Sequence, residues 1–265
     1  MLKTQSEIRG AAAVIAFENP PQGFMTHRGA AELLRLATEA VSDPAVRALI
    51  LTGSQPGVFV RHYDIASIAR GAEALKTGKA TIEDFARFPF TELTDLCASA
   101  DKPVIAAING VCMGGGFELA LACDIRIAGA SVTQIGLPEI LADIFPGGGG
   151  TQRLPRLIGE ARALDFVLRG RVVDAATALS LGLVHEIAAD PLEAAVALAA
   201  TLSTRSPLAL STIKHLVRAA ADRPIADGLG EERSAFARLL RDDPNLATDL
   251  ARFAEADGDL ATRLR

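Results

Sequence analysis

Hydrophobic and polar positions follow two kinds of pattern in the first half of the chain. Short apolar runs, which predict strands, occur at 12–17, 46–52, 104–108 and 125–130. The run at 104–108 is apolar on both faces, as is typical of a strand in a covered parallel sheet. Helical spacing at 29–41 and from 81 to 98, with an expected break at Pro89, predicts helices between the strands. This alternation favours an α/β domain with parallel strand pairing.

Two glycine-bearing segments are expected to turn the chain rather than to form strands. They are 53–57, followed by a polar-interrupted connection over 58–64, and 110–116.

The pattern changes beyond about residue 150. Strand signals nearly vanish there, apart from 184–187. The chain from 192 to 264 has the pattern of successive helices, which are separated near Ser206-Pro207, Arg223-Pro224 and Asp243-Pro244. We therefore expect an α/β core over residues 1–200 and a helical C-terminal region over residues 201–265.

Composition narrows the class of protein. Hydrophobic residues make up 49% of the 265 positions and charged residues 22%, which excludes a disordered chain. A net charge of −5 without long runs of like charge disfavours a nucleic-acid partner. Because the chain has no Trp and one Tyr, it also lacks the aromatic platforms on which bases or sugars stack.

Cysteine and histidine usage argues against metal and disulfide sites. The three cysteines have no CxxC spacing and the four histidines lie far apart, so neither a zinc site nor a disulfide framework is expected. The N-terminus has no long apolar segment, and about 18 uninterrupted apolar residues occur nowhere. We expect a cytoplasmic protein with no membrane partner.

The most informative segment is 106–120, where a predicted strand runs into the glycines 114–116 and a helix begins. Glycines allow a ligand to approach the backbone, and the free N–H groups of a helix start attract negative charge. The spacing fits neither a P-loop nor a dinucleotide-binding fingerprint, because the required Lys and the third glycine are absent. The segment therefore indicates an anion or oxyanion site, with tight packing as the alternative.

Two carboxylates accompany this segment. Glu118 lies one helical turn beyond Gly115, where it could exchange protons with a substrate polarised there. Glu139 lies among apolar residues after Pro138, and such surroundings can raise the pKa of a carboxyl group. For each acid alone, a glutamate that complements the start of a helix is the more common interpretation.

The segment 102–159, which contains both acids, resembles the core signature of the enoyl-CoA hydratase/isomerase family, the crotonase superfamily. Weaker resemblance extends to 47–53, 175–184 and 206–209. It implies a spiral of ββα units with a C-terminal helical region used in assembly. It also implies an acyl-CoA substrate, no separate cofactor because coenzyme A is part of the substrate, and a homotrimer or hexamer.

The resemblance assigns roles by position. It implies backbone oxyanion donors at Tyr63 and Gly115, catalytic glutamates at Glu118 and Glu139, and substrate contacts from His62, Asp64, Ile65 and Gly114. His62 stands where the family has glycine. The segment 22–26 lacks the basic residue with which many members contact the nucleotide.

The leading prediction is an enoyl-CoA hydratase. Within the same fold, His62 suggests another enolate reaction, such as double-bond isomerisation or C–C bond hydrolysis. A non-catalytic acyl-CoA binding protein would not need two acids in apolar surroundings. A glycosidase pair of carboxylates is disfavoured by the lack of Trp.

Overall fold

The computed structural model describes residues 4–256 and 258–260. Contacts between residues divide the chain into two units, 1–204 and 205–265. The expected boundary after residue 200 lies inside helix α9 (Pro191–Ser203).

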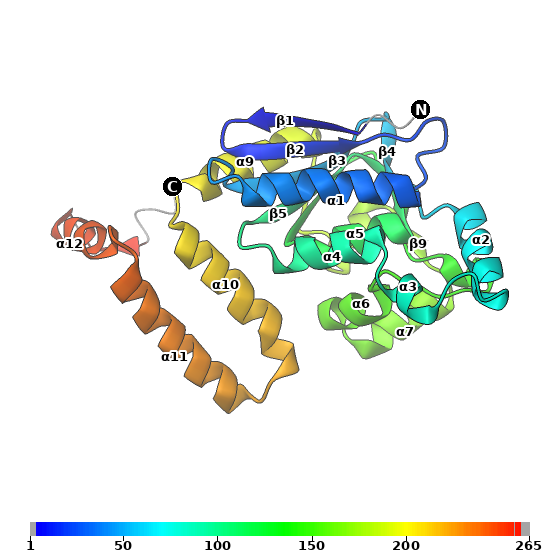
Figure 1. The fold of residues 1–265 in the computed structure, drawn as a ribbon. Coiled ribbons are helices and arrows are strands. Elements are labelled where there is room, and N and C mark those ends of the chain that lie inside the picture. The colour runs from blue at the N-terminus through cyan, green and yellow to red at the C-terminus, as the bar shows by residue number, and fades with distance from the viewer. Residues whose placement is uncertain (1–3, 257, 261–265) are drawn as a thin grey trace. The chain divides into compact units, whose positions relative to one another are not determined.

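The first unit is built on a six-stranded sheet with the order β1-β2-β3-β5-β7-β10 (Figure 1). Its strands are β1 (Gln5–Arg9), β2 (Ala12–Phe17), β3 (Ala48–Gly53), β5 (Val104–Ile108), β7 (Ile125–Gly129) and β10 (Glu186–Ala188). Among the described strands of this sheet, β1 and β2 pair antiparallel and the other neighbours pair parallel. The parallel pairing expected from the sequence is therefore confirmed.

A second, four-stranded sheet has the order β4-β6-β8-β9. Its strands are β4 (Gly57–Val60), β6 (Gly110–Met113), β8 (Ile135–Gly136) and β9 (Val172–Val173). Successive chain segments give one strand to each sheet: β3 and β4, then β5 and β6, then β7 and β8. Helix α2 (Ile65–Lys76) follows β4, and α5 (Gly115–Ala122) follows β6. This arrangement confirms the crotonase-like spiral of ββα units.

The second sheet corrects the expected turns. Strands β4 and β6 occupy segments that the glycines suggested would be turns or connections. The glycines allow close strand packing here, because a Cβ on Gly110 would overlap the Gly57 carbonyl group. Strand β1 was not expected either, since most of its side chains are exposed and give no apolar run.

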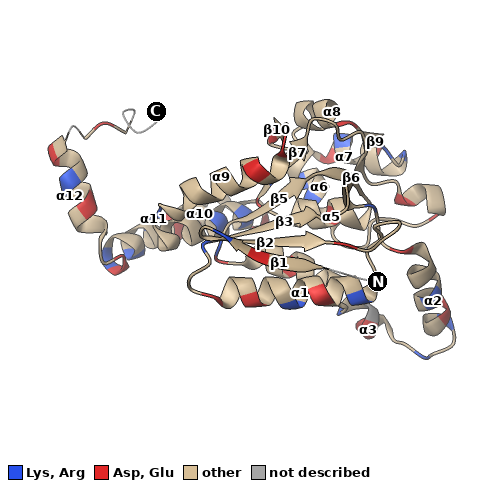
Figure 2. Cartoon of the chain, turned by 90° about the horizontal axis from the view of Figure 1, so that it is seen from above, with Lys and Arg blue, Asp and Glu red and all other residues tan. Residues whose placement is uncertain are grey.

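Helices cover both faces of the large sheet. Ile15 and Leu51 belong to the core that the sheet forms with α1 (His27–Ser42) and α4 (Pro89–Ser99). The intervening residues Val14 and Ile50 pack with α9 on the other face. Figure 2 shows α1 and α9 on opposite sides of the strands, with acidic and basic residues alternating along α1.

The remaining helices of the first unit are α3 (Ile82–Ala86), α6 (Gly150–Ile158), α7 (Glu160–Leu168), α8 (Ala175–Ser180) and a short 3-10 helix, η1 (Glu139–Ala142). The expected break at Pro89 is confirmed, because Pro89 is the first residue of α4.

The second unit consists of α10 (Pro207–Ala219), η2 (Ala220–Asp222), α11 (Ile225–Asp242) and α12 (Leu246–Ala256). The breaks expected near Pro207, Pro224 and Pro244 are confirmed. Ser206 caps α10, and its hydroxyl donates a hydrogen bond to the carboxylate of Asp243. Several large apolar side chains of this unit are exposed, among them Ile213, Val217 and Phe236.

Candidate active site

The segments that follow three neighbouring strands of the small sheet form the site. β4, β6 and β8 run parallel, so their C-terminal ends meet at one edge. Tyr63 follows β4, Gly115 follows β6 and Glu139 follows β8.

The backbone of Tyr63 is oriented by pairing with Met25. The N–H of Met25 donates to the His62 carbonyl at 2.8 Å, and the N–H of Asp64 donates to the Met25 carbonyl at 2.7 Å. Because N–H directions alternate along an extended chain, the N–H of Tyr63 points away from Met25. The Tyr63 nitrogen lies 3.4 Å from the position that a Cβ would take on Gly115.

Gly115 begins helix α5, and Gly114 precedes it as the N-cap with φ of 49°. The first turn of a helix leaves its N–H groups without intrahelical partners. Among the residues that the structure describes, neither the Gly115 N–H nor the Tyr63 N–H donates a hydrogen bond. The structure therefore brings together two free donors that were predicted from positions far apart in the chain.

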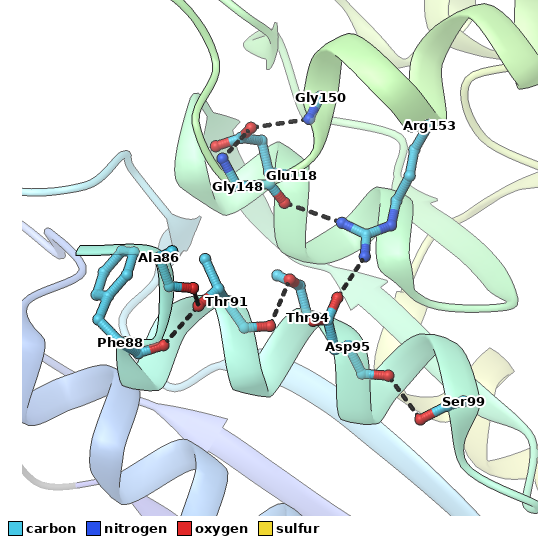
Figure 3. Close-up of polar contacts among 10 residues, drawn as sticks. All are labelled: Ala86, Phe88, Thr91, Thr94, Asp95, Ser99, Glu118, Gly148, Gly150 and Arg153. Carbon is cyan, nitrogen blue, oxygen red and sulfur yellow. Dashed lines mark hydrogen bonds and ion pairs between the residues drawn. The ribbon is translucent and has the colours of Figure 1, made fainter. Parts of the chain in front are cut away.

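Glu118 is held one turn further along α5. The residue is only 3% exposed, and Oε1 accepts hydrogen bonds from the N–H groups of Gly148, at 2.7 Å, and Gly150, at 2.9 Å (Figure 3). Two of the glycines at the start of α6 thus hold the carboxylate of Glu118, because their amides point at that oxygen.

Opposing effects act on Glu118. Burial raises its pKa above the ordinary value, while the N–H groups of Gly150 and Gly148 and the positive charge of Arg153 work in the other direction. The two donated hydrogen bonds favour the charged carboxylate over the acid. Oε1 is fully engaged with the glycine amides. Among the described contacts, Oε2 accepts no hydrogen bond.

Glu139 has the opposite surroundings. Both of its carboxylate oxygens are buried, and neither has a hydrogen-bond partner among the described residues. Burial, with the nearby charge of Glu118, raises the pKa of Glu139 to about 8. Its Oε1 lies 3.3 Å from the position that a Cβ would take on Gly114. The site thus pairs a hydrogen-bonded carboxylate with a carboxyl group that keeps its proton at neutral pH.

His62 packs beside this arrangement. Its half-buried ring stacks on Phe24 with 4.5 Å between ring centroids, and Nδ1 lies 2.8 Å from the Tyr63 carbonyl oxygen. The space that His62 needs comes partly from Gly114, since a Cβ there would lie 3.2 Å from the His62 Cβ. A contact between His62 or Gly114 and substrate stays a prediction.

Asp64 and Ile65 stand at the start of α2. The carboxylate of Asp64 accepts hydrogen bonds from Ala66 and Ser67, as expected of a helix N-cap. Ile65 is 48% exposed. These contacts explain why an acid follows Tyr63, and a substrate-binding role for either residue stays a prediction.

Aromatic side chains close one side of the site, and sequence reasoning missed two of them. The Tyr63 ring meets Phe88 and Phe90 edge to face, with 5.7 Å between centroids in each pair. Phe90 also lies against Gly115, 3.3 Å from the position of a Cβ. Burial, helped by Asp64, raises the pKa of Tyr63 to about 12, so its hydroxyl stays protonated. No motif spacing marks Phe88 or Phe90.

The part of the chain that the structure describes shows neither a candidate metal site nor a membrane-spanning helix. The described residues contain no group of three or more His, Cys, Asp or Glu side chains placed to hold a metal ion. None of their helices combines the length and the apolar character needed to cross a membrane.

Comparison with known proteins gives consistent matches. The sequence model of the family described as enoyl-CoA hydratase/isomerase matches residues 7–257. A Mycobacterium leprae protein named "Probable enoyl-CoA hydratase echA8" is 39% identical over 77% of this chain and 76% of that protein. A crystal structure of an enoyl-CoA hydratase from Polaromonas sp. JS666 has a TM-score of 0.86 and 28% identity, covering 96% of this chain and 97% of that one. Pseudomonas aeruginosa DspI has a TM-score of 0.84 and 34% identity, covering 96% of this chain and 94% of that one.

Proposed function

This chain belongs to the enoyl-CoA hydratase/isomerase family, whose members are acyl-CoA-binding enzymes of the crotonase type, and we propose that it adds water across the α,β double bond of an enoyl-CoA thioester. The observation that carries this proposal is the contrast between its two acids. Glu118 is a carboxylate held by two amides, and Glu139 is a buried acid without partners. Hydration needs both a proton acceptor and a proton donor.

The two free amides bind the thioester carbonyl oxygen. Water attack at the β carbon moves negative charge onto this oxygen, and the N–H groups of Gly115 and Tyr63 stabilise the resulting enolate. Each donor of this kind is worth about 2.7 to 4 kcal/mol of transition-state stabilisation. Both donors belong to the backbone, so the tyrosine side chain at position 63 does not remove one.

Glu118 and Glu139 carry out the proton transfers of the reaction. Oε2 of Glu118 accepts a proton from water while the water oxygen bonds to the β carbon. Glu139 donates its proton to the α carbon as the enolate collapses. At the end Glu118 is protonated and Glu139 is ionised, and exchange with solvent restores both. The raised pKa of Glu139 supports its assignment as the acid.

A substrate comparison tests this function. The purified protein is given a short 2-enoyl-CoA and, separately, a 3-enoyl-CoA, and the products are separated by chromatography before their masses are measured. A hydratase converts the 2-enoyl-CoA to a product heavier by one water. Conversion of the 3-enoyl-CoA without a change in mass, and no hydration, would instead identify an isomerase. The Glu118→Gln/Glu139→Gln double variant serves as the control for contaminating activity.

We also propose that residues 205–265 serve assembly into a homotrimer or hexamer. Exposed apolar side chains such as Ile213, Val217 and Phe236 support this role, because such surface is normally covered by a partner. Light scattering of the full chain tests the assembly, and a monomeric mass at micromolar concentration would rule it out.

A further inference from the structure

Arg153 holds an unusual position in the first turn of α6. Its Nη1 donates to the Gly148 carbonyl oxygen at 2.9 Å, and Nη2 pairs with Asp95 Oδ1 at 3.3 Å (Figure 3). Only 20% of the side chain is exposed. The guanidinium therefore turns back over the start of its own helix.

Helix electrostatics disfavour this placement. The start of a helix carries partial positive charge, so a cation there is destabilising. The guanidinium also requires glycine at position 149, where φ is 106° and a Cβ would overlap Nη1. Its partner Asp95 is 78% exposed, and pairs of that kind contribute little to stability. The ion pair alone does not explain why a cation is held here.

Gly148 connects Arg153 to the reaction site. Its carbonyl accepts from Arg153, and its N–H donates to Oε1 of Glu118. The charged group that acts on Glu118 is Arg153 from α6, and Glu118 in turn acts on Glu139 of η1. Asp95 on α4 pairs with Arg153. Among the described residues, Arg153 thus supplies the positive charge that acts on the carboxylate of Glu118, next to the acid Glu139.

We propose that Arg153 is a positioning residue for Glu118: it fixes the 148–150 segment through the Gly148 carbonyl and places a positive charge beside the carboxylate. This inference rests on the proposed function only in giving Glu118 the part of the base. Loss of Arg153 would leave the fold in place but make Glu118 easier to protonate. The Arg153 charge opposes the effect of burial on the pKa of Glu118, in agreement with this role.

The test compares two variants of the same helix. Arg153→Met removes the guanidinium, and Arg156→Met removes a positive charge from an exposed position one turn further on. Carboxyl carbon NMR of the ligand-free protein follows the titration of Glu118, identified by its loss in Glu118→Gln. We expect the midpoint to move to higher pH in Arg153→Met and to stay in place in Arg156→Met.

Kinetics provide a second readout. The kcat of Arg153→Met should begin to fall at a higher pH than that of the wild type as the pH is lowered, because protonated Glu118 cannot accept a proton from water. Below both midpoints, each unit by which the pKa of Glu118 rises lowers kcat by about tenfold relative to the wild type. Arg153→Lys retains the positive charge but lacks the planar guanidinium. The pH profile of its kcat should therefore lie between those of the wild type and Arg153→Met. A purely structural role would lower Tm and leave the pH profile unchanged.

The outcomes separate the two proposals. An unchanged Glu118 titration in a folded Arg153→Met protein would overturn the positioning role. If that variant does not fold, Arg153→Gln, which also removes the charge, takes its place, and an unchanged Glu118 titration there would overturn the role equally. A shifted titration in a protein without hydratase activity would retain the positioning role and reject the proposed reaction.

Discussion

Glu139 is buried next to Glu118, and the charge of Glu118 adds to the effect of burial in raising the pKa of Glu139 to about 8. This coupling gives a direct prediction. In Glu118→Gln the neighbouring charge is gone, so the pKa of Glu139 falls below that of the wild type. Carboxyl carbon NMR of the ligand-free protein measures it. Because burial is the larger cause, the pKa should stay above the ordinary glutamate value. An unchanged midpoint would mean that the two acids are not coupled.

The proposed roles of Glu118 as base and Glu139 as acid predict a bell-shaped dependence of kcat/KM on pH. kcat/KM falls as the pH rises through about 8, where Glu139 loses the proton it must donate, and falls at acid pH as Glu118 becomes protonated. Well above the upper midpoint, the loss approaches about tenfold per pH unit. Initial rates with a short 2-enoyl-CoA measure the profile. A rate that stays constant from pH 7 to pH 10 would contradict the assignment of Glu139 as the acid.

Stability has its own pH dependence. The folded protein holds the Glu139 proton up to about pH 8, whereas the ordinary pKa of a glutamate carboxyl is 4.5. Folding stability therefore decreases as the pH rises through this window, because the unfolded chain ionises first. Glu139→Gln removes the penalty and should raise Tm by about 4 °C or more at pH 9, with a smaller gain at pH 5. Thermal unfolding measures both, and the exposed Glu73→Gln variant should show no such trend.

Gly115 permits a test of the backbone donor. Gly115→Pro removes the N–H, and proline is tolerated at the first position of a helix. We expect turnover to fall about 100-fold to 1000-fold with the fold retained. Gly115→Ala is the matched control, since it keeps the N–H and its Cβ meets Phe90 and Tyr63 at 3.3 and 3.4 Å. Equal activity of the two variants would mean that the Gly115 amide does not bind the carbonyl oxygen.

The sequence predicted the parts of this site that depend on local spacing. Glu118 follows Gly115 by three residues, so a helix beginning at Gly115 places both on one side. The apolar neighbours of Glu139 indicated a raised pKa, which the structure gives. The short apolar runs became strands of the large sheet, because burial on both faces leaves a continuous apolar pattern.

What the sequence did not predict depends on contacts between distant segments. The amides of Gly148 and Gly150 reach Glu118 across at least 30 positions, and no local pattern marks that contact. The direction of the Tyr63 N–H depends on its pairing with Met25. Strands β4 and β6 are short, and their glycines resemble turn signals until the neighbouring backbone is in place.

The small sheet also determines which changes in chain length the site can tolerate. Tyr63, Gly115 and Glu139 each follow a separate strand, and hydrogen bonds between strands set their mutual alignment. Residues inserted in the surface segment between α2 and α3 would leave these strand ends aligned. A single residue deleted from β6 would shift the pairing of this strand by one position, move its side chains to the other face of the sheet and take Gly115 out of alignment with Tyr63 and Glu139. Loops of this protein can therefore diverge in length while the three strands cannot.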